Sequence, residues 1–254
     1  MAKNDPLPAA LVTGASRGIG RAIAEQLAAR GVRVGVHFHT NRIAAEKVLA
    51  ALPGSGHQLF QADLADAAAC AELFAGAVRA FDRIDVLVNN AGIYEKHDLK
   101  NTTFAEWQRL WQHTLAANLG GPAHLSFLAA QHMRAAGGGR VVNISSRGAF
   151  RGEPDAPAYG AAKAGLNALG QSLAKALAPE KIYIFTLAPG WVDTDMAAPH
   201  ITGPRAAEIL DQQPLGRVTS PGEVASAAVF CALDAPAAMT GAIIDVNGAS
   251  YLRT

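Results

Sequence analysis

Tyr159 and Lys163 lie four residues apart in a segment whose apolar pattern predicts a helix, so we expect their side chains on one face. A free tyrosine has a pKa of about 10, too high for efficient proton exchange near neutral pH. An ammonium group about 4 Å away, at an effective dielectric constant near 20, is worth on the order of 4 kcal/mol, or at most roughly three pKa units. Tyr159 is therefore a candidate proton donor, and Lys163 a candidate activator that would bring the pKa of the phenol near 7. The spacing alone arises readily by chance.

A glycine-rich loop follows the first predicted strand, residues 9–13, and opens a predicted helix over residues 19–30. Its glycines are Gly14, Gly18 and Gly20. Glycines let the backbone turn sharply and approach a pyrophosphate, which free amides and the helix dipole then stabilise. The loop is therefore a candidate dinucleotide site, and the alternative is an ordinary tight turn.

The end of the second predicted strand bears on the choice of cofactor, since an acidic residue there would bind the ribose 2′-hydroxyl of NAD. That position holds Phe38 instead. Polar residues follow it: His39, Thr40, Asn41 and Arg42. Together with Arg17 from the glycine loop they could converge on a 2′-phosphate, which favours NADP. The alternative is that Arg17 and Arg42 are solvated residues at helix starts.

Strands and helices alternate along the whole chain. Strands are predicted near residues 9–13, 32–38, 59–60, 85–89, 140–144, 182–187 and 242–246. Helices are predicted near 19–30, 43–51, 66–81, 104–115, 118–136, 159–178 and 223–233. This order predicts one α/β domain over residues 1–254, with a doubly wound parallel sheet of about seven strands and helices on both faces. The glycine loop and Tyr159 then lie at the same edge of the sheet.

Residues 195–214 form the longest segment without a predicted element. They include Pro199, Gly203, Pro204 and Pro214, and they follow a strand end, where α/β proteins bind ligands. We therefore expect an irregular substrate lid.

Composition excludes several classes of function. Among 254 residues, 50% are hydrophobic and the net charge is +1, which favours a large core and gives no basic stripe for nucleic acid. Cys70 and Cys231 lack metal or redox spacing, and the eight histidines show no ligand cluster, so we expect no metal. We find neither an apolar signal segment near the start nor a stretch that could span a bilayer, and we expect a soluble, cytoplasmic protein.

Taken jointly, the motifs resemble those of the short-chain dehydrogenase/reductase family, most closely its 3-oxoacyl-carrier-protein reductase branch, over nearly the whole chain. The resemblance rests on these residues: Thr13, Gly14, Gly18, Gly20, Asp63, Leu64, Asn89, Asn90, Ala91, Gly92, Asn118, Ser145, Ser146, Tyr159, Lys163, Pro189, Gly190, Val246, Asn247 and Gly248. It implies a Rossmann-like fold.

The resemblance also implies four roles in catalysis. Tyr159 would give its proton to a carbonyl oxygen that Ser146, thirteen residues earlier, would orient. Lys163 would also bind the nicotinamide ribose, and Asn118 would hold a water molecule that connects Lys163 to solvent. The alternatives are that Asn118 caps the helix that follows and that Ser146 is only a turn residue.

The implied cofactor contacts run along the chain in the following order: Gly14, Ser16, Arg17, Gly18, Ile19 and Gly20 in the loop; His39, Thr40, Asn41 and Arg42; Asp63 and Leu64 at the adenine; Asn90, Ala91 and Gly92 at the centre; and Tyr159, Lys163, Pro189, Gly190, Val192 and Thr194 near the nicotinamide. Residues 89–92 could alternatively form only a turn.

Two departures weaken the resemblance to enzymes of acyl carrier proteins. Phe185 stands where the family commonly has Asn, and glycines occupy 137–139, where such reductases often carry basic residues. The pocket walls are expected to include Tyr94, Phe150, Trp191 and Met196.

Small residues mark one part of the helix that carries Tyr159. They are Ala161, Ala164, Gly165 and Ala168, and the family typically forms tetramers across such a surface, so we expect a homotetramer. The alternative is that these small residues face the sheet.

The leading functional hypothesis is an NADPH-dependent reductase of a ketone or aldehyde. The alternatives are an NAD(P)-dependent secondary-alcohol dehydrogenase and a dinucleotide-binding regulator without turnover. A regulator would not need Asn118, Ser146, Tyr159 and Lys163 together, which argues against it.

Overall fold

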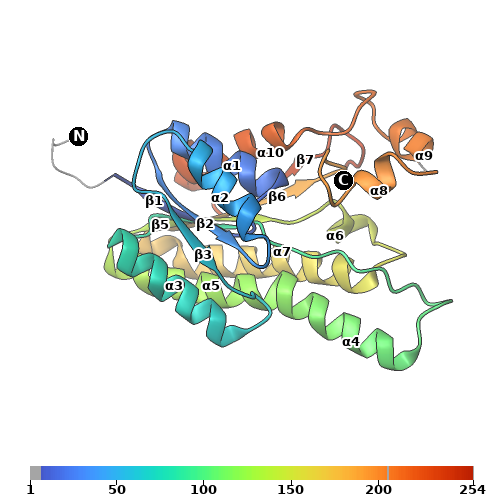
Figure 1. Ribbon diagram of the computed structural model, residues 1–254, viewed down its shortest axis with the longest axis horizontal. Coiled ribbons are helices and arrows are strands. Elements are labelled where there is room, and N and C mark those ends of the chain that lie inside the picture. Colours follow the sequence, from blue (N-terminus) through green and yellow to red (C-terminus); the bar gives the residue numbers. More distant parts are fainter. Residues whose placement is uncertain (1–6, 205, 254) are drawn as a thin grey trace.

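The computed structural model describes residues 7–204 and 206–253 and contains one sheet of seven parallel strands, which confirms the predicted architecture (Figure 1). The strands are β1 (Ala9–Val12), β2 (Arg33–Phe38), β3 (Gln58–Gln61), β4 (Val86–Asn89), β5 (Gly139–Ile144), β6 (Ile182–Pro189) and β7 (Ile243–Val246). Their order in the sheet is β3-β2-β1-β4-β5-β6-β7.

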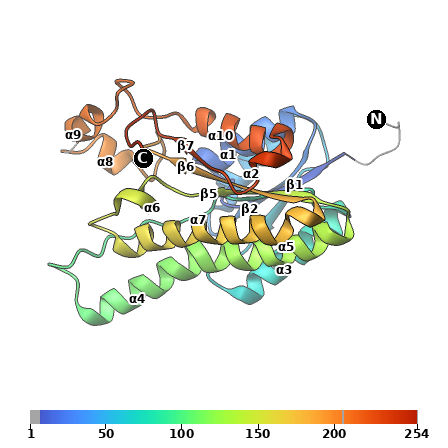
Figure 2. The ribbon, with the colours of Figure 1, turned by 180° about the vertical axis from the view of Figure 1, so that it is seen from behind.

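Helices cover both faces of this sheet, as Figures 1 and 2 show. One face carries α1 (Gly18–Ala29), α2 (Arg42–Ala51) and α10 (Pro221–Val229), and the other carries α3 (Ala67–Phe81), α5 (Gly121–Ala135) and α7 (Pro157–Leu177). The remaining helices are α4 (Phe104–Leu115), which extends beyond the sheet, and the short α6 (Gly148–Arg151), α8 (Ala198–Ile201) and α9 (Ala206–Asp211).

The alternation of strand side chains builds two separate apolar cores. Val12 points into the core that also contains Ile23 of α1, whereas its neighbour Leu11 belongs to the core that contains Leu125 and Met133 of α5. All five of these side chains are fully buried. Both faces of the strands are therefore apolar, as a parallel sheet between two helical layers requires.

The strand order reverses beside β1, because β1 pairs with β2 on one side and with β4 on the other. In doubly wound sheets, ligands bind in the crevice outside the carboxyl ends of the strands at such a switch point. The loops after β1, β4, β5 and β6 all leave the sheet at this edge.

The predicted helix from residue 118 begins differently. A π-helical turn, Ala116–Gly120, joins α4 to α5, so that Asn118 lies within this turn and the residue preceding α5 is Gly120.

The prediction that 195–214 is irregular was wrong, because α8 and α9 lie within it. A second π turn, Phe230–Asp234, extends α10.

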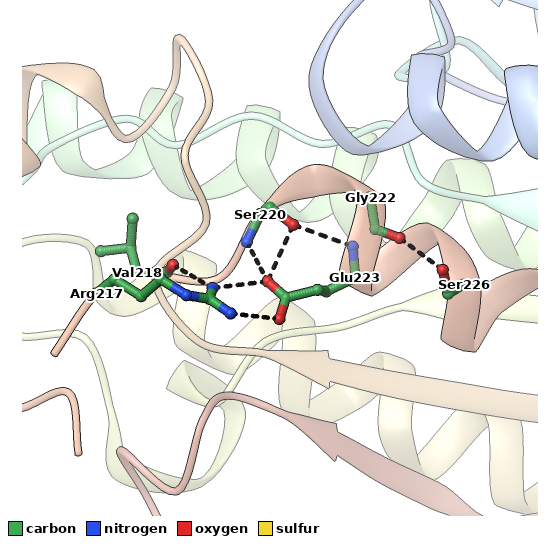
Figure 3. Close-up of polar contacts among 6 residues, drawn as sticks. All are labelled: Arg217, Val218, Ser220, Gly222, Glu223 and Ser226. Carbon is green, nitrogen blue, oxygen red and sulfur yellow. Dashed lines mark hydrogen bonds and ion pairs between the residues drawn. The ribbon is translucent and has the colours of Figure 1, made fainter. Parts of the chain in front are cut away.

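Backbone hydrogen bonds join the residues just before the 195–214 segment to those just after it. The Asp193 N–H donates to the Thr219 carbonyl, and the Thr219 N–H donates to the Trp191 carbonyl, each at 2.9 Å. Immediately afterwards a capping box starts α10: Ser220 Oγ accepts from the Glu223 N–H at 3.3 Å, and Glu223 Oε2 accepts from the Ser220 N–H at 2.8 Å. Arg217 donates to both oxygens of the Glu223 carboxylate (Figure 3), and this pairing lowers the pKa of Glu223 to about 2.

No helix among the described residues is sufficiently long and apolar to cross a bilayer.

Candidate active site

A cavity of about 590 Å³ opens at the carboxyl ends of the strands, within the usual size range of small-molecule sites. Most of the residues expected at the site line it: Gly14, Ser16, Arg17, Gly18, Ile19, His39, Thr40, Asn41, Asp63, Leu64, Asn90, Ala91, Gly92, Ser146, Tyr159, Lys163, Pro189, Gly190, Val192 and Thr194. Gly20, Arg42 and Asn118 are not among the lining residues.

The glycine loop presents an uncapped helix end to this cavity. Helix α1 begins after Arg17 with no side-chain cap and no acidic residue in its first turn. Gly18 and Ile19, whose N–H groups lie in that turn, line the cavity. A pyrophosphate fits this end, because free amides and the helix dipole both favour an anion.

Two glycines are needed for the shape of the loop. Gly14 has a φ of +62°, in the left-handed region that favours glycine. A Cβ on Gly20 would collide with the Gly14 carbonyl and the Asn90 amide. Gly20 therefore faces the loop and the Asn90 amide, where it lets α1 pack closely, and it does not line the cavity.

His37 of β2 binds the backbone of the glycine loop, and the sequence analysis did not identify it as a site residue. Its Nδ1 accepts from the Gly14 N–H at 3.0 Å, and its Nε2 lies 3.2 Å from the Ala62 carbonyl, so Nε2 is the nitrogen that carries hydrogen. Burial lowers its pKa to about 4, which keeps the ring neutral in this role. A polar residue within an apolar strand was the available signal.

The polar residues expected near the adenine ribose differ in whether they face the cavity. Phe38 is buried, while the Asn41 side chain accepts from the Ala44 N–H at 3.0 Å and so caps α2. Arg17 lies 3.7 Å from the Asp195 carboxylate, and both side chains are largely exposed.

Arg42 points along α2 instead. Its guanidinium donates to Glu46 at 3.2 Å and lies over the Phe38 ring. The structure thus brings Arg17, but not Arg42, to the cavity.

Ser146, Tyr159 and Lys163 meet at the other end of the cavity. Tyr159 lies in the first turn of α7, and Ser146 follows β5, where its Oγ accepts from the Gly148 N–H at 3.0 Å. The Lys163 ammonium donates to the Ile144 carbonyl at 2.8 Å and lies 5.7 Å from the centre of the Tyr159 ring.

The prediction that the Tyr159 pKa lies near 7 was wrong. Burial raises the pKa of Tyr159 to about 12, although a hydrogen bond with Ser146 acts in the opposite direction. Burial likewise lowers the pKa of Lys163 to about 8. Desolvation therefore outweighs the attraction that residue spacing alone suggested.

Asn118 supports the floor of the cavity. It is fully buried, its Oδ1 accepts from the Ile93 N–H at 2.8 Å, and its Nδ2 donates to the Ile93 carbonyl at 2.9 Å. Both halves of its amide thus hold the loop after β4. The interpretation of Asn118 as a helix cap was wrong, because the side chain binds this loop within the π turn.

Aromatic residues form the wall beside Tyr159. Tyr94, Trp191 and Met196 line the cavity as expected, whereas Phe150 does not and stacks on Tyr251 with ring centres 6.5 Å apart. His200, which the sequence did not single out, also lines the wall.

The rings of this wall contact one another. The Tyr94 ring lies edge-on to Tyr159 at 5.1 Å, and His200 lies 5.9 Å from Tyr94 and 5.3 Å from Trp191. The arrangement can enclose an apolar or cationic part of a substrate.

Comparisons with known proteins agree with this geometry. A model of the family described as enoyl-(acyl carrier protein) reductase matches residues 14–249. The 3-oxoacyl-[acyl-carrier-protein] reductase of Escherichia coli is 37% identical over 243 residues, covering 96% of this chain and 97% of that protein. An uncharacterised short-chain type dehydrogenase/reductase of Sinorhizobium fredii is 35% identical over 251 residues, covering 96% and 97%. The chain belongs to the short-chain dehydrogenase/reductase family.

A further relative of this short-chain dehydrogenase/reductase carries a different name. The cis-4-hydroxycyclohexanecarboxylate dehydrogenase of Sinomonas cyclohexanicum is 38% identical over 242 residues and covers 94% of each chain. A protein named as a 3-oxoacyl-[acyl-carrier-protein] reductase and one named as a cis-4-hydroxycyclohexanecarboxylate dehydrogenase are thus similarly related to the chain. Membership establishes an oxidoreductase of the family that uses nicotinamide dinucleotides, without selecting a substrate.

The small residues of α7 in this short-chain dehydrogenase/reductase face outward. Ala161, Ala164 and Ala168 are exposed, and Gly165 is half-buried against Leu119. The alternative in which they face the sheet was wrong for the three alanines.

Proposed function

We propose that the protein is an NADPH-dependent reductase that converts a ketone or aldehyde to an alcohol. The observation that carries this proposal is the shared cavity, which has the uncapped end of α1 on one side and the Ser146 and Tyr159 hydroxyls on the other. A dinucleotide bound across it would bring its nicotinamide to the hydroxyl pair.

The proposed mechanism divides the reduction among three side chains. When bound, NADPH supplies the hydride that forms the new C–H bond. Ser146 donates a hydrogen bond to the carbonyl oxygen and so orients it, while Tyr159 transfers its phenolic proton to the same oxygen and completes the alcohol. Lys163, with a pKa of about 8, can hold or release a proton near neutral pH and would also bind the nicotinamide ribose.

The protonation state of Tyr159 favours the reductive direction. With a pKa of about 12 the phenol keeps its proton at neutral pH, as a proton donor must. Alcohol oxidation would need the phenolate, which is scarce at neutral pH when the pKa is this high. Oxidation of a secondary alcohol is the second candidate function, because one of the relatives is named as a dehydrogenase.

NADPH is favoured over NADH by the residues around the adenine ribose. Phe38 ends β2 where an acidic side chain would select NAD, and Arg17 reaches the cavity. Asp195, 3.7 Å from Arg17, is the anion that a 2′-phosphate would displace.

We also propose that residues 1–254 act as one domain, with residues 195–214 as the substrate lid and a cytoplasmic homotetramer as the working assembly. Met196, Ala197 and His200 of the proposed lid line the cavity, which supports its contact with substrate. Asn118 would position the water that links Lys163 to solvent.

The test follows NADPH and NADH absorbance with β-keto esters, diketones, steroids, sugars and quinones, using wild type and Tyr159→Phe. We expect turnover of at least one carbonyl with NADPH preferred, and a loss of at least 100-fold in kcat in the variant. Full activity of Tyr159→Phe would contradict the mechanism, and a preference for NADH would contradict the assignment of Arg17. Tight NADPH binding without turnover of any carbonyl would favour a regulator.

A further inference from the structure

Glu153 places a carboxyl group in the substrate end of the cavity, and no step of the proposed mechanism uses it. The residue lies on the loop between α6 and α7, is half-buried, and lines the cavity together with Tyr94 and Tyr159. Burial is the main cause of the raised pKa of both phenols, and the charge of Glu153 raises each of them further.

No hydrogen bond to this carboxyl is found within residues 7–204 and 206–253, and its oxygens remain accessible from the cavity. Burial accordingly raises its own pKa, although Arg151 and Arg147 act in the opposite direction. A ligand that displaces water from this carboxyl must supply a donor in its place, because otherwise the charged group loses its hydration without compensation.

The two nearby arginines are engaged elsewhere. Arg147 is buried and donates to Ser250 Oγ at 2.6 Å, and Arg151 is exposed and donates to Gln212 at 3.3 Å. Neither forms an ion pair with Glu153 among the described residues. The acceptor that faces substrate is therefore the carboxyl itself.

The position of the carboxyl is held by its surroundings. A Cβ on Gly148 would collide with Glu153 Oε1, so the glycine at this position leaves the room that the carboxyl occupies. The adjoining wall is aromatic, with Tyr94 and Trp191, and suits the face of a carbon ring or a cation.

Resting on the proposed reductase activity, we propose that Glu153 selects carbonyl substrates that carry a hydrogen-bond donor, a hydroxyl or an ammonium group, and disfavours those that carry a carboxylate. A donor on the substrate would supply the missing partner of the carboxyl. A substrate carboxylate would meet like charge in a partly dehydrated cavity.

The test uses cyclohexanones that carry hydrogen, hydroxyl, ammonium or carboxylate at carbon 3 or 4. We expect the wild type to reduce the hydroxyl and ammonium compounds with a kcat/KM about tenfold to 100-fold above that of the unsubstituted ketone, mainly through KM. The carboxylate compounds should be the poorest substrates. Equal or better use of the carboxylates by wild type would overturn the proposal.

Two variants separate charge from shape. Glu153→Gln keeps an acceptor oxygen at nearly the same size, so it should keep much of the hydroxyl preference, lose the ammonium preference about tenfold or more, and improve the carboxylate compounds. Glu153→Ala should lose both preferences. Asp155→Asn removes a charge from the same loop outside the cavity lining and should change these ratios far less than Glu153→Gln does.

A purely structural role predicts a different pattern. Glu153→Gln and Glu153→Ala would then lower kcat/KM for all cyclohexanones by the same factor, which would overturn the inference while leaving the reductase proposal intact. If wild type reduces no ketone, the proposed activity fails separately. Binding of 4-aminocyclohexanol and cyclohexanol, followed by tryptophan fluorescence with oxidised cofactor present, then tests Glu153 directly. The inference stands only if wild type, but not Glu153→Gln, prefers the amine.

Discussion

His37 couples β2 to the glycine loop through one acceptor nitrogen. Because Nδ1 accepts from the Gly14 N–H, His37→Leu leaves a backbone donor without a partner, at a cost of about 1–3 kcal/mol. We expect the variant to raise the cofactor Kd about tenfold, measured by fluorescence titration. His37→Asn places an amide oxygen near the position of Nδ1 and should restore most of the affinity. Equal losses in both variants would contradict this role.

The same histidine makes stability depend on pH. Its folded pKa of about 4 lies below the ordinary value of 6.5, so the unfolded chain binds a proton first as the pH falls. The contribution of neutral His37 is fully present above pH 6.5 and is lost as the pH falls toward 4. Urea unfolding across this range should show wild type losing more stability than His37→Asn.

Lys163 is expected to reduce the stability of the ligand-free protein. Its folded pKa of about 8 lies below the ordinary 10.5, so burying the charged form costs on the order of 3 kcal/mol below pH 8. The cost disappears as the pH rises from 8 to 10.5, where the unfolded chain also loses its proton.

Lys163→Met should therefore abolish turnover yet raise the free energy of unfolding at pH 7 by about 1–2 kcal/mol, since the hydrogen bond to Ile144 is lost at the same time. Urea unfolding should show this difference narrowing above pH 8. Lys175→Met, at an exposed site on the same helix, is the control and should change stability by less than about 0.5 kcal/mol. A destabilised Lys163→Met at pH 7 would contradict the desolvation argument.

Helix α1 and the glycine loop depend on close backbone contact. Because a Cβ at position 20 would collide with the Gly14 carbonyl, Gly20→Ala should displace the loop and weaken dinucleotide binding at least tenfold, measured by calorimetry. Gly76→Ala is the matched control, since its Cβ would meet nothing closer than 3.8 Å within α3. It should stabilise the protein by up to about 1 kcal/mol without affecting binding. Unchanged affinity in Gly20→Ala would contradict the packing argument.

The regular elements were predictable because their signals are local. Apolar runs and the glycines and prolines between them located all seven strands to within a few residues. The continuous passage from α4 into α5 was not predictable, because Gly120, Gly121 and Pro122 resemble a helix boundary in sequence. Similarly, the prolines of 195–214 hid α8 and α9, which are too short for a periodic pattern to emerge.

The candidate site was predictable where backbone chemistry dictates residue type, as at the glycine loop, and where the family motif supplied Ser146 and Tyr159. The pKa of Tyr159 was not, because desolvation depends on the packing of α7 and its neighbours rather than on spacing. Glu153 was missed for a similar reason, since an acidic residue in a loop ordinarily faces water.

The exposed alanines of α7 bear on the whole molecule. Ala161, Ala164 and Ala168 leave an outward strip without large side chains, where a second helix could approach closely. If this strip lies between subunits of a homotetramer, Ala168→Arg would bury a bulky charge there and should convert tetramers to smaller species. Light scattering with size-exclusion chromatography measures the change. Ala50→Arg, on the exposed side of α2, should leave the assembly unchanged. A monomeric wild type, or an intact Ala168→Arg tetramer, would contradict the assignment of this face.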